Sequence, residues 1–274
     1  MGLTKTKNPI LDYTPEIAPA AVCIVLYSIV TVIHGYFVFR RPKFLGMLPV
    51  FIGGVMLVIG YITRLIVRNN LYSVPIYAVS TLCILLPPSL FAAAVYMVFG
   101  RLLKYLNRTD VSLVRVNWIT KIFIMGDVIS FMAQGAGGGL QTSTNLSTQK
   151  LGGNVALAGL SIQLAFVAIF LVVMSIAHHR LLSVTSIKTI PNAKYSWKTL
   201  VYALYVGVVL ILIRSVYRVI EFAQGYHGLL NSHEIYLYLL DALPMFLWMV
   251  LFCIVNPSMV IVNYSSSDME MLRV

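Results

Sequence analysis

Three charged side chains interrupt a long apolar segment, in the stretch ILIRSVYRVIEFAQGY at residues 211 to 226. Arg214 and Arg218 are four residues apart and Glu221 follows by three, so a helix would carry all three on one face. Charged groups are costly inside a bilayer, where they pair with one another or mark a substrate or ion pathway. This segment is therefore the first candidate for a functional site.

Asp241, in the next apolar segment, is the natural counter-charge for the two arginines. With a rise of about 1.5 Å per residue, Arg214 lies roughly 22 Å from the start of its helix, and Asp241 lies roughly 10 Å from the opposite side. Arg218 and Glu221 then fall in the outer third of the membrane, where water lowers the cost of a charge. Two interpretations stay open: an ion-pair network that fixes the packing of two helices, or a polar vestibule open to the outer leaflet.

A second polar set lies in the segment WITKIFIMGDVISFMAQGAGGGL, residues 118 to 140. Asp127 falls in the inner half of this segment, and the sequence names no partner for it. Gln134 and the glycines Gly137, Gly138 and Gly139 reach the outer depth of the arginines. Small residues favour close helix packing, whereas a locally unwound segment would offer free amides to a lipid head group; both interpretations stay open.

Two prolines in the third apolar segment and two residues at the end of the second are further candidates for a functional role. Pro87 and Pro88 stand inside the third apolar segment and remove two backbone donors, which predicts a bend and freed carbonyls one turn earlier, near Cys83 and Ile84. The second segment, GGVMLVIGYITR, ends on Tyr61 and Arg64. An aromatic and a basic residue at the end of a span are more typical of an interfacial anchor than of a site.

The composition shows which elements must position these residues. The chain of 274 residues is 59% hydrophobic and 11% charged, with a mean hydropathy of +0.87. A soluble domain of this size could not cover its surface with so few polar residues, whereas a helix bundle in lipid needs no polar surface. We therefore expect an all-α polytopic membrane protein. Apolar segments of about 20 residues predict seven spans, near 17–39, 46–67, 76–99, 118–140, 154–177, 199–223 and 235–257.

Basic residues predict the direction of the bundle. Lys and Arg gather in the first, third and fifth connections, whereas the fourth holds only Lys150 and the sixth holds none. By the positive-inside rule the odd connections are cytoplasmic. We therefore expect an extracellular tail at 1–16, the seven-helix domain at 17–257 and a short cytoplasmic tail at 258–274. Asn145 begins a glycosylation sequon in the fourth connection, on the predicted outer side.

Several classes of function receive no support from the sequence. The net charge of +11 comes from the connections, which indicates contact with anionic lipid head groups rather than nucleic acid. The three cysteines lie in three different spans and the five histidines do not converge, so we expect no cofactor and no metal. The sequence has no P-loop motif, so the chain does not hydrolyse ATP by a P-loop mechanism.

Five segments in order resemble the RTA-like family of fungal lipid-translocating exporters: GGVMLVIGYITR, LLPPSLFAAAVYMVFGR, WITKIFIMGDVISFMAQGAGGG, IRSVYRVIEFAQGYHG and HEIYLYLLDALPMFLW. The resemblance implies seven helices in a fungal plasma or vacuolar membrane. It also implies a role in efflux or transbilayer movement of sphingoid long-chain bases and in resistance to toxic amphiphiles, and one relative is tied to porphyrin traffic and haem uptake. The family positions that it carries onto this chain are Gly60, Tyr61, Arg64, Asp127, Gln134, Gly137, Gly138, Gly139, Arg214, Arg218, Glu221, Gln224, Glu234 and Asp241. One position departs, because Leu57 stands where family members usually carry a glutamate, and this puts a cationic sphingoid base in question as the substrate.

The sequence thus predicts a translocase for amphiphilic lipids that is not an enzyme. We expect the head group to enter a polar face formed by the fourth, sixth and seventh helices while the tail stays in the bilayer. Movement is either facilitated or coupled to protons through Asp127, Glu221 or Asp241. The expected location is the plasma membrane, with a vacuolar or other internal membrane as the alternative, and the expected partners are membrane lipids and the transported amphiphile.

A seven-helix lipid sensor is the alternative function, because the number of spans and the predicted orientation fit it equally well. Against this alternative, the inner end of the third span reads Phe99-Gly100-Arg101 in place of the acidic-Arg-Tyr triplet of one receptor class. An intramembrane enzyme is the weakest alternative, because the histidines do not converge into a zinc site.

Overall fold

The fold is a bundle of long helices, seen here in a computed structural model that describes residues 16–40, 45–69, 74–112, 115–141, 143, 145–183, 196–224 and 234–261. Seven helical segments in these ranges are long and apolar enough to cross a membrane, which confirms the predicted number of spans. All regular elements of the described ranges are helical. They are α1 (Ile17–Arg40), η1 (Leu45–Met47), α2 (Leu48–Asn69), α3 (Val74–Leu85), α4 (Pro87–Tyr105), η2 (Thr109–Val111), α5 (Val116–Gln141), α6 (Leu146–Leu182), α7 (Trp197–Gln224), α9 (Glu234–Leu237), η3 (Tyr238–Ala242), α10 (Leu243–Ile254) and α11 (Pro257–Ile261).

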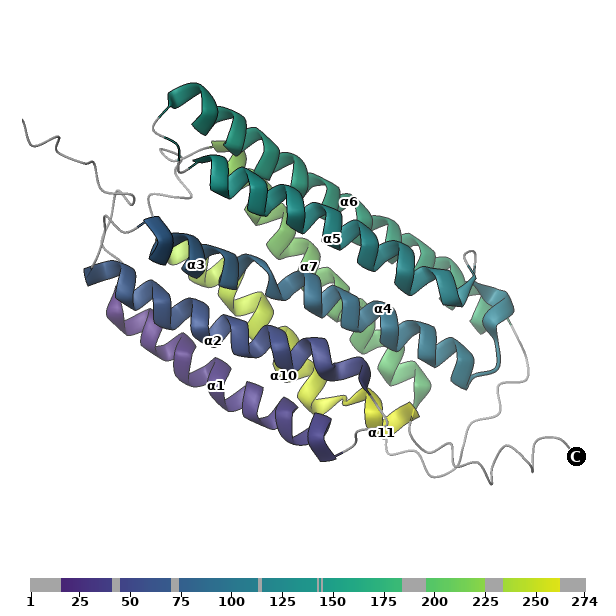
Figure 1. Ribbon diagram of the computed structural model, residues 1–274. Coiled ribbons are helices and arrows are strands. Elements are labelled where there is room, and N and C mark those ends of the chain that lie inside the picture. The colour runs from purple at the N-terminus through teal and green to yellow at the C-terminus, as the bar shows by residue number, and fades with distance from the viewer. Residues whose placement is uncertain are drawn as a thin grey trace, which may run out of the picture.

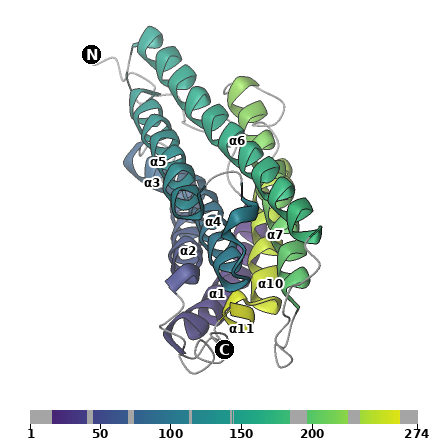
Figure 2. The same ribbon diagram turned by 90° about the vertical axis from the view of Figure 1, so that its right-hand side faces the viewer.

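The bundle has two outer pairs of helices around a central group. Figure 1 shows α5 and α6 side by side along one flank, and α1 and α2 along the other. Between them run α4, α7 and α10, and the turned view in Figure 2 shows the same grouping. The third span, made of α3 and α4, and the seventh, made of α9, η3 and α10, therefore both reach the middle of the bundle, where α7 contacts them.

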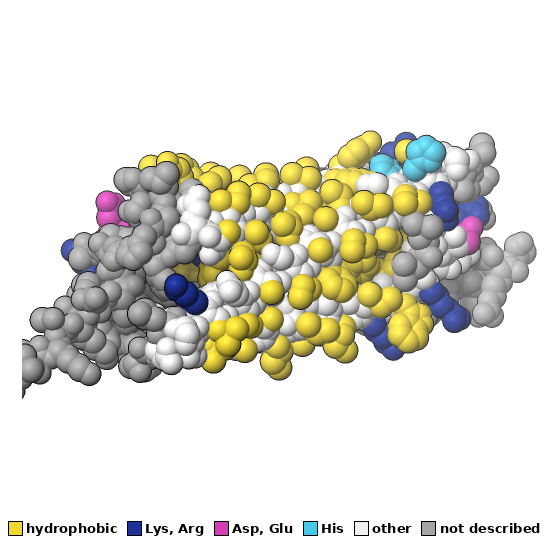
Figure 3. Space-filling view, turned by 90° about the horizontal axis from the view of Figure 1, so that it is seen from above, with side chains coloured by type: hydrophobic (Ala, Val, Ile, Leu, Met, Phe, Trp, Pro, Cys, Tyr) yellow, Lys and Arg dark blue, Asp and Glu magenta, His cyan; other side chains and the backbone are white. Residues whose placement is uncertain are grey.

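The outer surface matches a membrane environment. Figure 3 shows a broad apolar band across the middle of the face in view, with Lys and Arg at its ends and a larger gathering of them at one end. On α1, for example, Val32 and Phe39 are 70% and 72% exposed. Exposed residues of this kind are expected where lipid replaces water. The more basic end holds the end of α1, the end of α4 and the start of α5, which is the end that we predict to be cytoplasmic.

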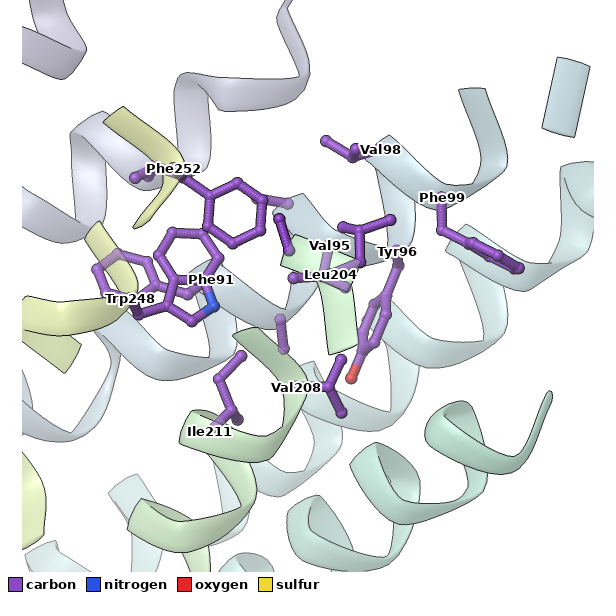
Figure 4. Packing of buried hydrophobic residues seen from close by; sticks show 14 of the residues in the cluster. Phe91, Val95, Tyr96, Val98, Phe99, Leu204, Val208, Ile211, Trp248 and Phe252 are labelled. Atoms are coloured by element: carbon purple, nitrogen blue, oxygen red, sulfur yellow. The ribbon is translucent and has the colours of Figure 1, made fainter. Parts of the chain in front are cut away.

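Aromatic side chains fill the centre between α4, α7 and α10. Phe91 stacks on Trp248 with ring centroids 4.6 Å apart, and Trp248 contacts Phe252 at 4.3 Å (Figure 4). Gly207 of α7 faces these rings so closely that a Cβ there would lie 2.9 Å from atoms of both Trp248 and Phe252. Close packing of this kind holds helices together in lipid, where the hydrophobic effect between helices is absent.

The third span continues to Tyr105 instead of ending near 99, and two other spans differ more from the predicted ranges. The fifth was expected at 154–177, but α6 has 37 residues and is about 55 Å long, because the polar turns that follow Asn145 are also helical. The seventh was expected as one helix at 235–257, but it contains the π-helical turn η3 between α9 and α10. Leu243 separates the turn from Pro244, whose missing amide cannot bond to the carbonyl four residues earlier. Instead, the N–H of Leu243 donates to the carbonyl of Tyr238, five residues back.

The bundle also extends past the predicted end of the membrane domain. α11 begins at Pro257 and contacts α4 and α7, with Ser258 and Val260 buried. The predicted cytoplasmic tail at 258–274 thus starts inside the packed bundle, and its part from 262 onward lies outside the described residues, as does the N-terminal tail up to 15.

Candidate functional site

Asp241 is held between two arginines of α7 in the interior of the bundle. Nε of Arg214 lies 2.6 Å from Oδ1 of Asp241, and Nη2 of Arg218 lies 2.6 Å from Oδ2. Arg218 also donates from Nε to Oδ1 at 3.0 Å, which makes its contact with the carboxylate bidentate. The rise per residue placed the two arginines and Asp241 at similar depth, and the ion pairs that this predicted are present. The π turn η3 carries Asp241, so the extra residue of that turn sets the angle at which the carboxylate meets α7.

Arg214 also connects this pair to the break in the third span. Its Nη2 donates to the carbonyl oxygen of Ile84 at 3.1 Å. In an unbroken helix that carbonyl would accept from residue 88, but Pro88 has no amide hydrogen. The predicted interruption and the predicted free carbonyl are both found, since α3 ends at Leu85 and α4 begins at Pro87. A buried arginine thus satisfies a carbonyl that the proline leaves free.

Glu221 completes this group, which we call the arginine network: Arg214, Arg218, Glu221 and Asp241. Nη1 of Arg218 lies 2.9 Å from Oε2 of Glu221, and the hydroxyl of Tyr217 donates to Oε1 of Glu221 at 3.3 Å. Two guanidinium groups therefore face two carboxylates, and the network as a whole carries no net charge.

The arginine network is covered in this conformation. The side chains of Arg218 and Asp241 are 6% and 3% exposed, and that of Glu221 is 11% exposed. The expectation that Arg218 reaches water in the outer third of the membrane is wrong, because its guanidinium turns inward to the carboxylate of Asp241. The geometry matches the interpretation of a helix-fixing ion-pair network. The alternative of an open outer vestibule would require another conformation. Gln224, expected in the same pathway, is at the exposed end of α7.

A second ion pair joins the second span to the start of the seventh. Nη2 of Arg64 lies 2.9 Å from Oε1 of Glu234, and the hydroxyl of Tyr238 donates to the same oxygen at 3.2 Å. Tyr61 is fully buried, and its ring stacks between those of Tyr27 and Tyr238. The expectation of an interfacial anchor at Tyr61 and Arg64 is therefore wrong: both side chains point into the bundle.

Tyr27 was missed by sequence reasoning. Its hydroxyl donates to the carbonyl oxygen of Ala242 at 2.6 Å, inside the π turn that carries Asp241. A tyrosine in the apolar run of α1 gives no signal in the sequence that separates this role from ordinary packing.

A separate polar group lies between α4, α5 and α6. Nε2 of Gln134 donates to Oε1 of Gln163 at 3.0 Å, and Nε2 of Gln163 donates to Oγ of Ser89 at 2.9 Å. Gln163 and Ser89 were not among the predicted site residues, although a lone amide in the apolar run LSIQLAFV was a usable signal. Ser89 is in the first turn of α4, so the amide chain reaches the same helix break as Arg214 does from α7.

Asp127 is buried near this amide chain. It is 4% exposed, and within the described part of the chain neither of its carboxyl oxygens has a hydrogen bond of regular geometry, although the hydroxyl of Tyr96 on α4 interacts with the carboxyl. Ser130 and Gln134 share its face of α5, but the hydroxyl of Ser130 donates to the carbonyl of Gly126. The structure therefore brings Asp127 and Gln134 to one region and the arginine network to another, with the start of α4 between them.

The glycine-rich end of α5 serves helix packing. α5 continues as a regular helix to Gln141, so the interpretation of a locally unwound segment is wrong. A Cβ on Gly137 would lie 2.5 Å from the backbone nitrogen of Ala156 on α6, which shows how closely the two helices approach. Gly138 and Gly139 face open space.

Asn145, the candidate glycosylation site, is exposed and caps α6. Its side-chain oxygen accepts from the backbone N–H of Ser147 at 3.0 Å.

Comparison with known proteins places the chain in a family. The family model described as RTA1 like protein matches residues 50–263, which include both polar regions. The chain belongs to the RTA1-like family. The match confirms the resemblance seen in the five sequence segments. No solved structure matches the chain significantly.

Three relatives of this RTA1-like protein, all from Saccharomyces cerevisiae, differ in what their names state. Protein RTM1 is 34% identical over 78% of the chain and 68% of its own length. Protoporphyrin uptake protein 1 is 29% identical over 93% of the chain and 94% of its own length. Sphingoid long-chain base transporter RSB1 is 26% identical over 89% of the chain and 72% of its own length. The family therefore includes membrane proteins named for transport and for uptake.

Leu57, where the resemblance leads us to expect a glutamate, is buried in the apolar core one turn before Tyr61. Three arginines in the described spans, Arg64, Arg214 and Arg218, pair with three acids, Glu234, Asp241 and Glu221. A glutamate at 57 would add a negative charge on this side of α2, so its absence leaves these ion pairs balanced.

Proposed function

We propose that this RTA1-like protein is a membrane transporter that moves amphiphilic molecules across or out of the membrane. The observation that carries the proposal is the position of Arg214. Its guanidinium bonds at once to the carbonyl of Ile84, at the break between α3 and α4, and to Asp241 in the π turn of the seventh span. Interrupted helices that meet at charged groups inside the membrane are a recurring construction of transporter sites. The relatives named for sphingoid-base transport and protoporphyrin uptake support the same class of function.

The chemistry of the arginine network suits an amphiphilic substrate. The guanidinium groups of Arg214 and Arg218 donate hydrogen bonds, and the carboxylates of Asp241 and Glu221 accept them. An amine or hydroxyl head group can bond to the carboxylates, and a carboxylate or phosphate can bond to the guanidinium groups. When the head group enters, its own hydrogen bonds replace those that the arginines and acids made to each other, which limits the cost of separating the buried pairs. The tail stays in the bilayer throughout.

The cellular role that follows is export or redistribution of sphingoid-base-like or toxic amphiphiles in a fungal membrane. Such movement would contribute to lipid asymmetry and to resistance against stress and drugs. We propose the plasma membrane as the location, with the N-terminus outside.

The experiment is a labelled-lipid efflux assay in fungal cells that lack the protein, overproduce it, or produce variants. A labelled sphingoid base, a labelled phospholipid and a porphyrin are compared. Overproduction should raise efflux or uptake of at least one of them, and Asp241→Asn should remove that increase at equal protein level. Ile213→Val is the matched control, because Ile213 precedes Arg214 and is 44% exposed on the outer face of α7.

No change for any of the three lipids would overturn the transport function and leave the sensor alternative. An unchanged rate in Asp241→Asn, with wild-type transport intact, would show that the arginine network is structural only.

A further inference from the structure

Asp127 differs from every other acidic residue in the described spans. Glu221 and Asp241 are bonded to arginines of α7, and Glu234 is bonded to Arg64. Asp127 is as deeply buried as the members of those pairs, at 4% exposure, yet it has no cationic partner among the described residues, and the Tyr96 hydroxyl that interacts with its carboxyl does not form a hydrogen bond of regular geometry. Asp127, Glu221 and Asp241 were the three acids expected to carry a proton during transport. Of these, Asp127 alone is outside an ion pair in the described residues.

The surroundings of Asp127 are aromatic. Tyr96 of α4 is the titratable side chain that interacts with this carboxyl. Its hydroxyl does not form a hydrogen bond of regular distance and angle within the described residues. The ring of Tyr96 contacts Phe170 of α6 at 4.5 Å and Phe123, one turn before Asp127, at 5.2 Å. No charged group of α3, α4 or α6 in the described residues acts on the carboxyl, and Lys121 of α5 lies over the ring of Trp118 instead.

A negative charge in this place would have no cationic partner among the described residues and at most one donor, the hydroxyl of Tyr96. An ionised side chain is costly inside a bilayer, and an apolar protein interior is no better as a solvent. A proton removes the charge and gives the carboxyl a donor, while the nearby polar groups Ser130 and Gln134 are already bonded to Gly126 and Gln163. These surroundings favour the protonated form of the carboxyl in this conformation.

We propose that Asp127 is the proton-binding site that couples amphiphile movement to a proton gradient. This inference rests on the proposed transport function. Asp127 binds one proton when its surroundings are closed and releases it when the bundle opens and water reaches the carboxylate, with no other bond made or broken. Tyr96, beside Asp127, and Ser89, in the amide chain, are both on α4. This helix begins at the break where the carbonyl of Ile84 accepts from Arg214. A change in the protonation of Asp127 can therefore move the helix that borders both polar regions.

A proton fits this place better than a metal ion does. Alkali and alkaline-earth ions need several oxygen ligands around them. Here the carboxyl and the hydroxyl of Tyr96 stand among phenylalanine rings, which supply none. A proton needs only the carboxyl itself.

The test uses the purified full chain in liposomes, with the fluorescent amphiphile that the wild type transports in cells. The accumulation ratio is the amphiphile concentration inside the liposomes divided by that outside. If one proton moves with each amphiphile, a gradient of one pH unit changes this ratio about tenfold, because one pH unit and a tenfold concentration ratio each correspond to about 1.4 kcal/mol. Asp127→Asn imitates the protonated side chain, so its accumulation ratio should not respond to the gradient. Asp110→Asn, in the exposed turn η2, is the control and should keep the tenfold response.

A second measurement does not depend on transport. Infrared difference spectra between acidic and alkaline samples should show a protonated carboxyl band that Asp127→Asn lacks and that shifts in Tyr96→Phe. If Asp127→Asn does not fold, the shift of the wild-type band in Tyr96→Phe assigns that band to the carboxyl beside Tyr96.

The outcomes separate the two proposals. Wild-type transport that ignores the pH gradient would overturn the coupling role and leave the transport function standing. A sodium gradient that replaces the proton gradient would also overturn it. Absence of all amphiphile transport in the liposomes would overturn the transport function, and with it the coupling.

Discussion

Replacing Asp241 by asparagine should destabilise the protein strongly, because the carboxylate serves two buried arginines. The side chains of Arg214 and Asp241 are 1% and 3% exposed. Removing one partner of a buried ion pair costs about 3–5 kcal/mol. Asparagine keeps the volume and one oxygen acceptor, and Arg218 retains Glu221, so we expect the lower end, about 3 kcal/mol. At about 2–4 °C per kcal/mol for a chain of this size, the melting temperature in detergent should fall by roughly 6–12 °C.

A double-mutant cycle isolates the ion pair from general loss of packing. Arg214→Met removes one positive charge while keeping a long side chain, so either single variant leaves one unbalanced charge in the interior. Arg214→Met with Asp241→Asn restores neutrality, because Arg218 and Glu221 then balance each other. The double variant should therefore lose at least about 1.5 kcal/mol less than the sum of the two single losses.

The assay is thermal unfolding followed by fluorescence-detected size exclusion, with Ile213→Val as the lipid-facing control that should stay within about 0.5 kcal/mol of wild type. Additive losses, equal within about 0.5 kcal/mol, would contradict the argument that the two charges stabilise each other.

The same thermal assay tests three further features. Gly137→Val should cost about 1–3 kcal/mol by forcing α5 and α6 apart, whereas Gly138→Ala, which faces open space, should be neutral or stabilising; equal effects would refute the packing role. Glu234→Gln should cost less than Asp241→Asn, about 1–2 kcal/mol, because its partner Arg64 is closer to the surface of the bundle; an equal loss would mean that burial does not set the cost. Pro88→Ala returns an amide donor to the carbonyl that Arg214 now uses, so it should keep the melting temperature within about 3 °C and lower lipid efflux; unchanged efflux would show that the helix break is not required.

The sequence predicted well those features that depend on position along one helix. Counting the rise per residue placed Arg214, Arg218 and Asp241 at matching depth, and the three side chains do meet. The missing amide of Pro88 predicted a free carbonyl near Ile84, and that carbonyl accepts from Arg214. In both cases the physical constraint is local: a fixed rise, or an absent donor.

Features that depend on how a helix is rotated about its axis escaped prediction. Arg64 and Glu234 are 170 residues apart, and nothing in either segment states that their faces meet. The rise per residue gave Arg218 an outer position but not the inward direction of its side chain. Hydropathy averages over a span, so it passed over Gln163, one amide in a long apolar run. The π turn also could not be read from the sequence, because a proline in a helix can equally produce a kink.

Charge balance links the two polar regions. The paired arginines and acids of the interior sum to zero, and Asp127 adds no charge while it holds a proton. A cationic head group that entered alone would leave the low-dielectric interior with an uncompensated positive charge, and Leu57 offers no acid to compensate for it. If Asp127 releases its proton as the cation enters, the net charge between the two membrane surfaces stays constant. Exchange of a proton for a cationic amphiphile therefore avoids the largest electrostatic cost of transport in this chain, whereas an uncharged or zwitterionic head group could move without it.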